Sequence, residues 1–306
     1  MRRMTFTIKT VIAFGVLALS CSMAQAVDRT WVSGVHGDDI NPCSRTGPCK
    51  TFAAAYQKTD IGGQINVVDA GAYGGVTIDH SITIDGSESL SGVTVPNDLV
   101  GIKIDAGPSD VIVLRGLNIQ GGGKTGIKFI GSGKLYVEDC RIFGFLETAI
   151  DFEPSGKSDL FVKDSVIRDN QGPGIFIRPL AGGSARATID HCKLDGNLSG
   201  LNAIDDAKVV IRDSVASGNT FSGIVAATLA AAPEVTVQSC LITNNVSYGL
   251  RAIGSKAKVR FGGSTVTAND EGLFADAGSS IDSFGDNKVD GNFVNNGVPN
   301  NTIPQL

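Results

Sequence analysis

The chain has 306 residues, which is enough for one large domain or two ordinary ones. Hydrophobic residues make up 42% and charged residues 19%, and this composition excludes an intrinsically disordered chain despite 39 glycines and 10 prolines. The formal net charge is −5, which argues against nucleic acid or anionic lipid as a partner.

The first 26 residues have the three parts of a secretory signal peptide. Arg2 and Arg3 give a basic start, residues 11–19 are apolar, and residues 24–26 (Ala-Gln-Ala) form a cleavage site. The apolar stretch is shorter than the roughly 20 residues that a membrane-spanning helix needs, which favours cleavage over a membrane anchor. We therefore expect residues 1–26 to be removed, leaving a secreted or periplasmic protein with no membrane span.

Two cysteines lie close together near the start of the mature chain. Cys43 and Cys49 flank a loop that contains Gly47 and Pro48. In an exported protein such a pair favours a disulfide that closes the loop. The alternatives are two free thiols or a metal-binding pair.

A repeat of about 24 residues fills the rest of the chain. We follow it by one marker residue in each unit, and the markers are spaced by 22 to 27 residues: Leu117, Cys140, Ser165, Cys192, Ser214, Cys240, Ser264 and Asn287. A large apolar residue stands three positions before each marker. A Gly followed by Ile, Leu or Val comes later in most units. Short runs of β-branched residues between Gly and Asn predict strands and turns rather than helices.

Units of this size cannot bury an apolar face alone and must stack. The sequence therefore predicts an all-β right-handed parallel β-helix of about nine or ten rungs, in which the hand follows from the general rule for parallel crossovers. We expect a monomer with one domain over residues 27–306. It would divide into an N-terminal cap with the disulfide loop (27–75), the coils (76–292) and a C-terminal tail (293–306).

An asparagine stands five residues after most markers. Asn tolerates left-handed backbone geometry at a turn, and stacked amide side chains can hydrogen-bond from rung to rung. We therefore predict a ladder formed by Asn170, Asn197, Asn219, Asn245, Asn269 and Asn292.

The start of the mature chain resembles the opening of secreted right-handed parallel β-helix proteins of the pectate-lyase-like superfamily. The resemblance rests on residues 31–34, 37–42, 48–53, 62–67 and 81–86. It implies a short capping helix at about residues 51–56, which would cover the apolar end of the coil. The superfamily includes pectate lyases, polygalacturonases and alginate epimerases, and also members without demonstrated activity. The sequence motifs of polygalacturonases and alginate epimerases are absent as sets, although the pair Asp205 and Asp206 is present.

Three cysteines take the marker position on alternate rungs. Successive members would lie roughly 9 to 10 Å apart, which is too far for a disulfide. Cys140, Cys192 and Cys240 are therefore predicted to be free and buried.

The residues immediately before the markers would stack in one column, and most of them carry carboxylate or imidazole groups that could bind a metal ion or take part in catalysis. Stacked carboxylates could bind Ca²⁺ or raise one pKa enough for acid/base catalysis, and a histidine would add a base that titrates near neutrality. The alternative is that these residues cap a turn. The column contains Asp139, Asp164, His191 and Asp213, and its outward neighbours alternate in charge as Glu138, Lys163, Asp190 and Arg212.

The sequence gives less guidance on activity. Aromatic residues for sugar stacking look scarce and scattered. Our leading hypothesis is an exported, non-catalytic β-helix that binds a polysaccharide or serves as an envelope or surface scaffold. The alternatives are a lyase or epimerase that acts on a uronate-containing glycan, which would use the acidic column, and a structural module that docks another protein. We expect no cofactor except, under the catalytic alternative, Ca²⁺ at Asp139, Asp164 and Asp213.

Overall fold

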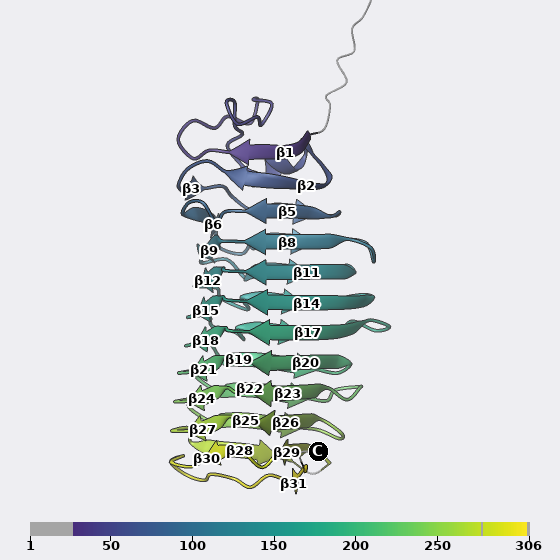
Figure 1. Ribbon diagram of the computed structural model, residues 1–306, viewed down its shortest axis with the longest axis vertical. Helices are drawn as coiled ribbons and strands as arrows, with labels where there is room; N and C mark the ends of the chain where they lie inside the picture. Colours follow the sequence, from purple (N-terminus) through teal and green to yellow (C-terminus); the bar gives the residue numbers. More distant parts are fainter. Residues whose placement is uncertain (1–26, 277, 305–306) are drawn as a thin grey trace, which may run out of the picture.

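The computed structural model describes residues 27–276 and 278–304. Their strands coil into a straight solenoid in which three parallel sheets run along the long axis (Figure 1). The nine strands of one sheet correspond to about nine full turns, as the repeat predicts. The proposed signal peptide, residues 1–26, lies outside the described residues.

The first sheet, sheet A, is the largest and has twelve strands. In spatial order its strands are β1 (Val27–Val32), β2 (Thr59–Val67), β5 (Ile82–Asp85), β8 (Val111–Arg115), β11 (Gly133–Glu138), β14 (Lys157–Lys163), β17 (Ser184–Asp190), β20 (Ala207–Arg212), β23 (Glu234–Gln238), β26 (Lys258–Gly262), β29 (Ser280–Ser283) and β31 (Asn301–Thr302).

Sheet B follows sheet A within each turn, and most of its strands are short. Its ten strands are β3 (Gly71–Ala72), β6 (Ser91–Val95), β9 (Leu117–Gly121), β12 (Arg141–Phe143), β15 (Val166–Arg168), β18 (Lys193–Asp195), β21 (Val215–Ser217), β24 (Leu241–Thr243), β27 (Thr265–Thr267) and β30 (Lys288–Val289).

Sheet C completes each turn, and most of its strands begin at or near the Gly-Ile or Gly-Leu pair of the repeat. Its strands are β4 (Val76–Ile78), β7 (Val100–Ile104), β10 (Thr125–Phe129), β13 (Ile150–Phe152), β16 (Ile175–Ile177), β19 (Ser199–Ile204), β22 (Ser222–Ala227), β25 (Tyr248–Ile253) and β28 (Glu271–Ala275).

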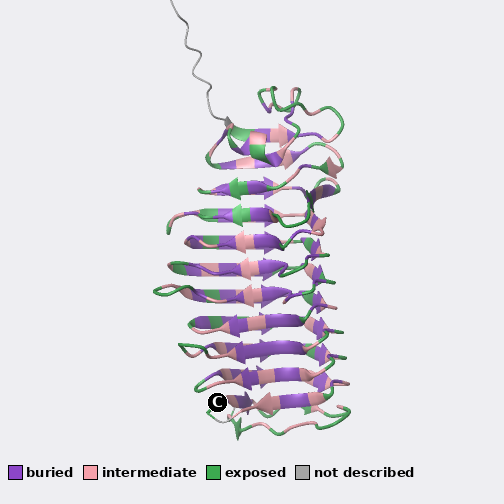
Figure 2. Cartoon of the chain, turned by 180° about the vertical axis from the view of Figure 1, so that it is seen from behind, coloured by how far each residue is buried: buried purple, intermediate pink, exposed green. Residues whose placement is uncertain are grey.

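The core fills the inside of the coil. Inward side chains alternate with outward ones along each strand, which is visible as alternating buried and more exposed segments in Figure 2. Equivalent inward residues stack from turn to turn, as Phe129 does on Phe152 with ring centres 4.5 Å apart. This continuous stack explains why a unit of about 24 residues folds only with its neighbours.

The predicted asparagine ladder is present, and its members are buried or partly buried. Each side-chain nitrogen from Asn170 to Asn269 donates to the side-chain oxygen of the next ladder member, over 2.7 to 3.4 Å. The expectation of left-handed geometry at the ladder asparagines needs a correction. The positive φ angles belong to the residues just before them: Asp169, Gly196, Gly218, Asn244, Ala268 and Gly291.

The N-terminal end of the coil is covered as the resemblance implied. The helix α1 (Phe52–Tyr56) begins after Thr51, whose side chain accepts a hydrogen bond from the Ala54 nitrogen at 3.1 Å. Phe52, Ala55 and Tyr56 of the helix are buried. No helix in the described part of the chain is long and apolar enough to cross a membrane.

The cysteine predictions are confirmed. Cys43 and Cys49 form a disulfide beside the capping helix, with Cα atoms 4.6 Å apart. Cys140, Cys192 and Cys240 are free and buried.

Candidate functional site

The predicted acidic column lies at the sharp turn from sheet A to sheet B. Asp139, Asp164, His191 and Asp213 all have φ angles between 48° and 50°, in the left-handed region that Asp, Asn and His tolerate better than most residues. Each side chain is exposed. Within the described residues, the carboxylates of Asp139 and Asp213 receive no hydrogen bond, so the backbone conformation, rather than local side-chain capping, accounts for the residue type at these two positions.

One part of this column forms a tighter group with its outward neighbours. Ligand atoms of Asp190, His191 and Asp213 lie within 4.8 Å of one another. Asp190 is buried, and its two oxygens pair with His191 Nδ1 at 2.7 Å and with Arg212 at 2.7 Å. Burial disfavours the charged form of Asp190, but the two hydrogen bonds outweigh the effect of burial and lower the pKa of Asp190. Because Arg212 already neutralises Asp190, the group fits an ion-pair network better than a cation site.

The three predicted calcium ligands are not brought together. Of Asp139, Asp164 and Asp213, only Asp213 belongs to that group within the described residues. The carboxylate of Asp164 instead lies 3.6 Å from Lys163 Nζ.

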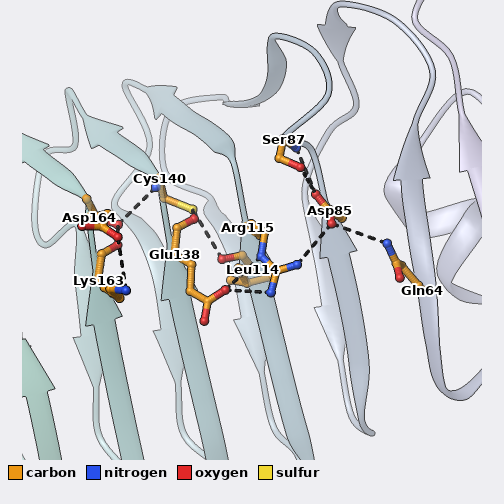
Figure 3. A network of polar contacts seen from close by, with 10 residues as sticks. Gln64, Asp85, Ser87, Leu114, Arg115, Glu138, Cys140, Lys163 and Asp164 are labelled. Carbon is orange, nitrogen blue, oxygen red and sulfur yellow. Dashed lines mark hydrogen bonds and ion pairs between the residues drawn. The ribbon is translucent and has the colours of Figure 1, made fainter. Parts of the chain in front are cut away.

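The alternating charges form a ladder across sheet A. Glu138, Lys163, Asp190 and Arg212 stand in register on successive strands. Figure 3 shows its upstream end, where Arg115 lies 2.8 Å from Glu138 and 3.4 Å from Asp85. These partly exposed pairs contribute little individually and give the outer face of sheet A a balanced charge.

Asp205, the first residue of the adjacent acidic pair, has a structural role. Its Oδ1 accepts hydrogen bonds from the backbone nitrogens of Leu229, Ala230 and Ala231 at 2.6 to 3.1 Å. Burial alone would raise its pKa, but these three bonds lower it. Asp205 therefore holds the longer turn after β22.

A second row of residues, which the sequence analysis did not identify, lies on the outer face of sheet C. We call it the C row. Strand register places one outward residue from each rung in it. Its members are Thr77, Lys103, Lys128, Asp151, Phe176, Asn202, Val225, Arg251 and Phe274.

Charged side chains cluster on the C row and its edge. Lys128 Nζ lies 2.6 Å from Asp151 and 2.8 Å from Glu153, and Arg178 also pairs with Glu153. Burial raises the pKa of Asp151 more than its bond to Lys128 lowers it. Burial also favours a higher pKa for Glu153, but the hydrogen bonds from Lys128 and Arg178 outweigh the effect of burial and lower the pKa of Glu153.

Several buried polar atoms on sheet C have no hydrogen-bond partner among the described residues. They are Asp151 Oδ1, Asn202 Oδ1, Ser222 Oγ and Arg251 Nε. Seven such side-chain atoms occur in the described chain, and four of them belong to strands of this sheet. Three of these atoms, on Asp151, Asn202 and Arg251, belong to the C row, so the outer face of this sheet offers polar groups that ordered water or a ligand could satisfy.

Aromatic residues also gather on this face, in contrast to the scattered impression that the sequence gives. The rings of Tyr248 and Phe274 have centres 4.8 Å apart, and Phe221 meets Tyr248 edge to face at 5.9 Å. The guanidinium of Arg251 lies against all three rings. These aromatic residues look scattered in the sequence because they lie about one repeat apart, and the stacking of successive turns brings them together.

The comparisons with known proteins agree with this architecture. A family model described as the right-handed beta helix region matches residues 64–197 and 179–294. No curated protein sequence matches the chain.

Two crystal structures are similar in fold. The pectate lyase Pel9A has 17% sequence identity and a TM-score of 0.66, over 83% of this chain and 74% of that one. The alginate lyase from Paenibacillus sp. str. FPU-7 has 14% identity and a TM-score of 0.53, over 82% of this chain and 99% of that one. The family match, which covers more than half of the chain, shows that the chain belongs to the right-handed β-helix proteins, and the two crystal structures share its fold.

Proposed function

We propose that this protein binds an extended polysaccharide along the outer face of sheet C without cleaving it. The observation that carries the proposal is the presence of unpartnered buried polar atoms in the C row, on Asp151, Asn202 and Arg251. Sugar hydroxyls both donate and accept hydrogen bonds, so a bound glycan could satisfy a carboxylate, an amide oxygen and an N–H group alike.

The shape of the face supports an extended ligand. Nine parallel strands at about 4.8 Å spacing give a surface on the order of 40 Å long. Partly exposed rings at Phe176 and Phe274 offer apolar surface for the faces of sugar rings. The two structurally similar lyases are named for polysaccharide substrates, which is consistent with a glycan ligand.

The charged groups favour binding over catalysis. Lys128 is shared by two carboxylates, and its hydrogen bonds to them raise its pKa in spite of the opposing effect of burial. A lysine held in its charged form is a poor general base.

A second candidate function, cleavage or epimerisation of a uronate polymer, is favoured by one observation. Burial raises the pKa of Asp151, as expected of a carboxyl group that exchanges protons during catalysis. Under this candidate Asp151 is the reactive group, whereas the acidic column of Asp139, Asp164, His191 and Asp213 stays as the alternative site. Under both candidates we propose that the protein is exported and monomeric.

The test is a binding panel with the protein lacking residues 1–26. Cellohexaose, xylan, polygalacturonate and alginate would be compared by thermal shift and by titration calorimetry, while ultraviolet absorbance follows any unsaturated product. We expect one class to raise the melting temperature without new absorbance. A new ultraviolet signal that is lost in Asp151→Asn would instead establish the cleavage branch of the second candidate. If no glycan binds, the scaffold or docking module becomes the better description.

Paired variants locate the binding face. Phe176→Ala removes an outward ring from sheet C, and Phe161→Ala removes an outward ring from sheet A, where it stacks on Tyr136 at 4.6 Å. We expect the first variant to weaken binding and the second to leave it unchanged. The opposite pattern would move the ligand to sheet A.

A further inference from the structure

We propose that Arg251 and the three rings around it form a subsite for an oxyanion carried by the glycan, either a carboxylate or a sulfate ester. The inference rests on the function proposed above and adds the class of ligand to it.

The rings hold the guanidinium in a fixed place. Its carbon lies 4.8 Å from the ring centres of Phe221 and Tyr248 and 5.8 Å from that of Phe274. Because these residues come from three successive turns, the side chain is supported from both neighbouring rungs. Arg251 is thus orientated before a ligand arrives, which reduces the entropy lost on binding.

The charge of Arg251 is unpaired within the described residues. By contrast, Arg178 pairs with Glu153, and Arg212 pairs with Asp190. Glu271 faces Tyr248 in the strand register and forms no ion pair with Arg251. In the C row, Val225 and Phe274 stand on either side of Arg251, so neither adjacent row position supplies an acid.

The donor set selects the ligand chemistry. A guanidinium presents a planar fork that matches two oxygens of one anion, and its buried Nε–H lacks a partner. The adjoining rings can stack on the apolar face of a sugar. A neutral glycan could use only the rings and single hydrogen bonds, whereas an anionic glycan would also use the charge.

The test uses three hexasaccharides that share a β-1,4-glucan backbone: cellohexaose, its glucuronic acid counterpart and a sulfated form. We expect both anionic sugars to bind more tightly than cellohexaose. Whichever of the two has the lower dissociation constant shows whether the preferred oxyanion is a carboxylate or a sulfate ester. Arg251→Gln should weaken anionic binding at least tenfold and weaken cellohexaose binding much less, because a neutral sugar loses a hydrogen bond but no charge interaction. Arg251→Lys should recover only part of the loss, because an ammonium group lacks the planar fork.

Arg141→Gln on the outer face of sheet B is the matched control, since it removes an exposed arginine from another sheet. A loss that is equal for neutral and anionic sugars, no loss in Arg251→Gln, or the same loss in Arg141→Gln would overturn the subsite. If none of the three hexasaccharides binds, the subsite is also rejected. In that case the proposed function still stands if the panel above finds a bound glycan, and it fails if the panel finds none.

Discussion

Asn219 donates two hydrogen bonds to one acceptor, the side-chain oxygen of Asn245: one from its backbone nitrogen at 3.2 Å and one from its side-chain nitrogen at 2.8 Å. The same pattern recurs along the ladder, so each amide side chain satisfies the backbone of the preceding turn as well as its own neighbour. These bonds lie in the interior, where an unsatisfied donor is costly.

The first prediction concerns this ladder. Asn219→Ala should lower the free energy of unfolding by about 2–3 kcal/mol. It leaves the backbone nitrogen of Asn197 without its acceptor, and it removes the side-chain hydrogen bond to Asn245 Oδ1, which keeps only the bond from the Asn219 backbone nitrogen. Asn292→Ala, at a partly exposed position near the end of the rod, should cost about 1 kcal/mol. Denaturant unfolding measures both values. Equal costs would contradict a ladder whose strength depends on burial.

The second prediction concerns the free thiols. Burial raises the pKa of Cys140 to about 12 and those of Cys192 and Cys240 to about 11. A thiol reagent should therefore label no cysteine in the native protein lacking residues 1–26, and three in denaturant without reductant. Rapid labelling of any cysteine under native conditions would show that the coil opens locally.

The third prediction concerns Glu153. Its pKa is lower in the folded than in the unfolded chain, so its carboxylate stabilises the fold above the unfolded pKa of about 4.3, and this contribution is lost as the pH falls through the folded pKa. Glu153→Gln should cost about 2–4 kcal/mol at pH 7, because it breaks ion pairs of a buried carboxylate with Lys128 and Arg178.

The difference between the Glu153→Gln variant and the wild type should shrink towards zero below about pH 4. Glu138→Gln on sheet A is the control, and the loss of this more exposed ion pair should cost no more than about 1 kcal/mol. A constant penalty for Glu153→Gln at all pH values would indicate lost packing rather than lost charge.

The fourth prediction separates backbone geometry from cation binding in the acidic column. Asp164 has a φ of 50°, which Asn also tolerates, so Asp164→Asn should be nearly neutral. Asp164→Val should cost about 1–2 kcal/mol, since a β-branched residue is strained there. Millimolar Ca²⁺ should leave the melting temperature unchanged. A calcium-dependent rise that disappears in Asp164→Asn would restore the calcium site and favour the catalytic alternative.

The fold could be predicted from the sequence because inward residues obey a strict repeat. The markers, the ladder asparagines and the inward apolar residues must each fit the same place in every turn, so their period survives in the sequence. The disulfide between Cys43 and Cys49 could also be predicted from the sequence, because both residues lie in one short loop.

The candidate site was harder to predict because outward residues are not constrained by packing. Lys128, Phe176 and Arg251 have nothing in common except their place one residue after the Ile or Leu of the Gly-Ile or Gly-Leu pair. That position was the available signal, and following it from turn to turn would have identified the C row. The unpartnered state of Asp151 Oδ1 depends on side-chain contacts and has no counterpart in the sequence.

The three corners of each turn differ in their tolerance of length changes. The corner from sheet A to sheet B is short and contains one left-handed residue, such as Asp139 or Asp164, and the next corner is fixed by the asparagine ladder. The longest spacing between markers, 27 residues from Ser165 to Cys192, includes the extended corner from sheet C to sheet A after Arg178. Foreign loops could therefore be grafted at this corner, for example at the exposed Ala181 and Gly182, without disturbing the register of the turns above and below. The corners from sheet C to sheet A thus form a row of sites for grafted loops, spaced about 4.8 Å apart along one edge of the solenoid.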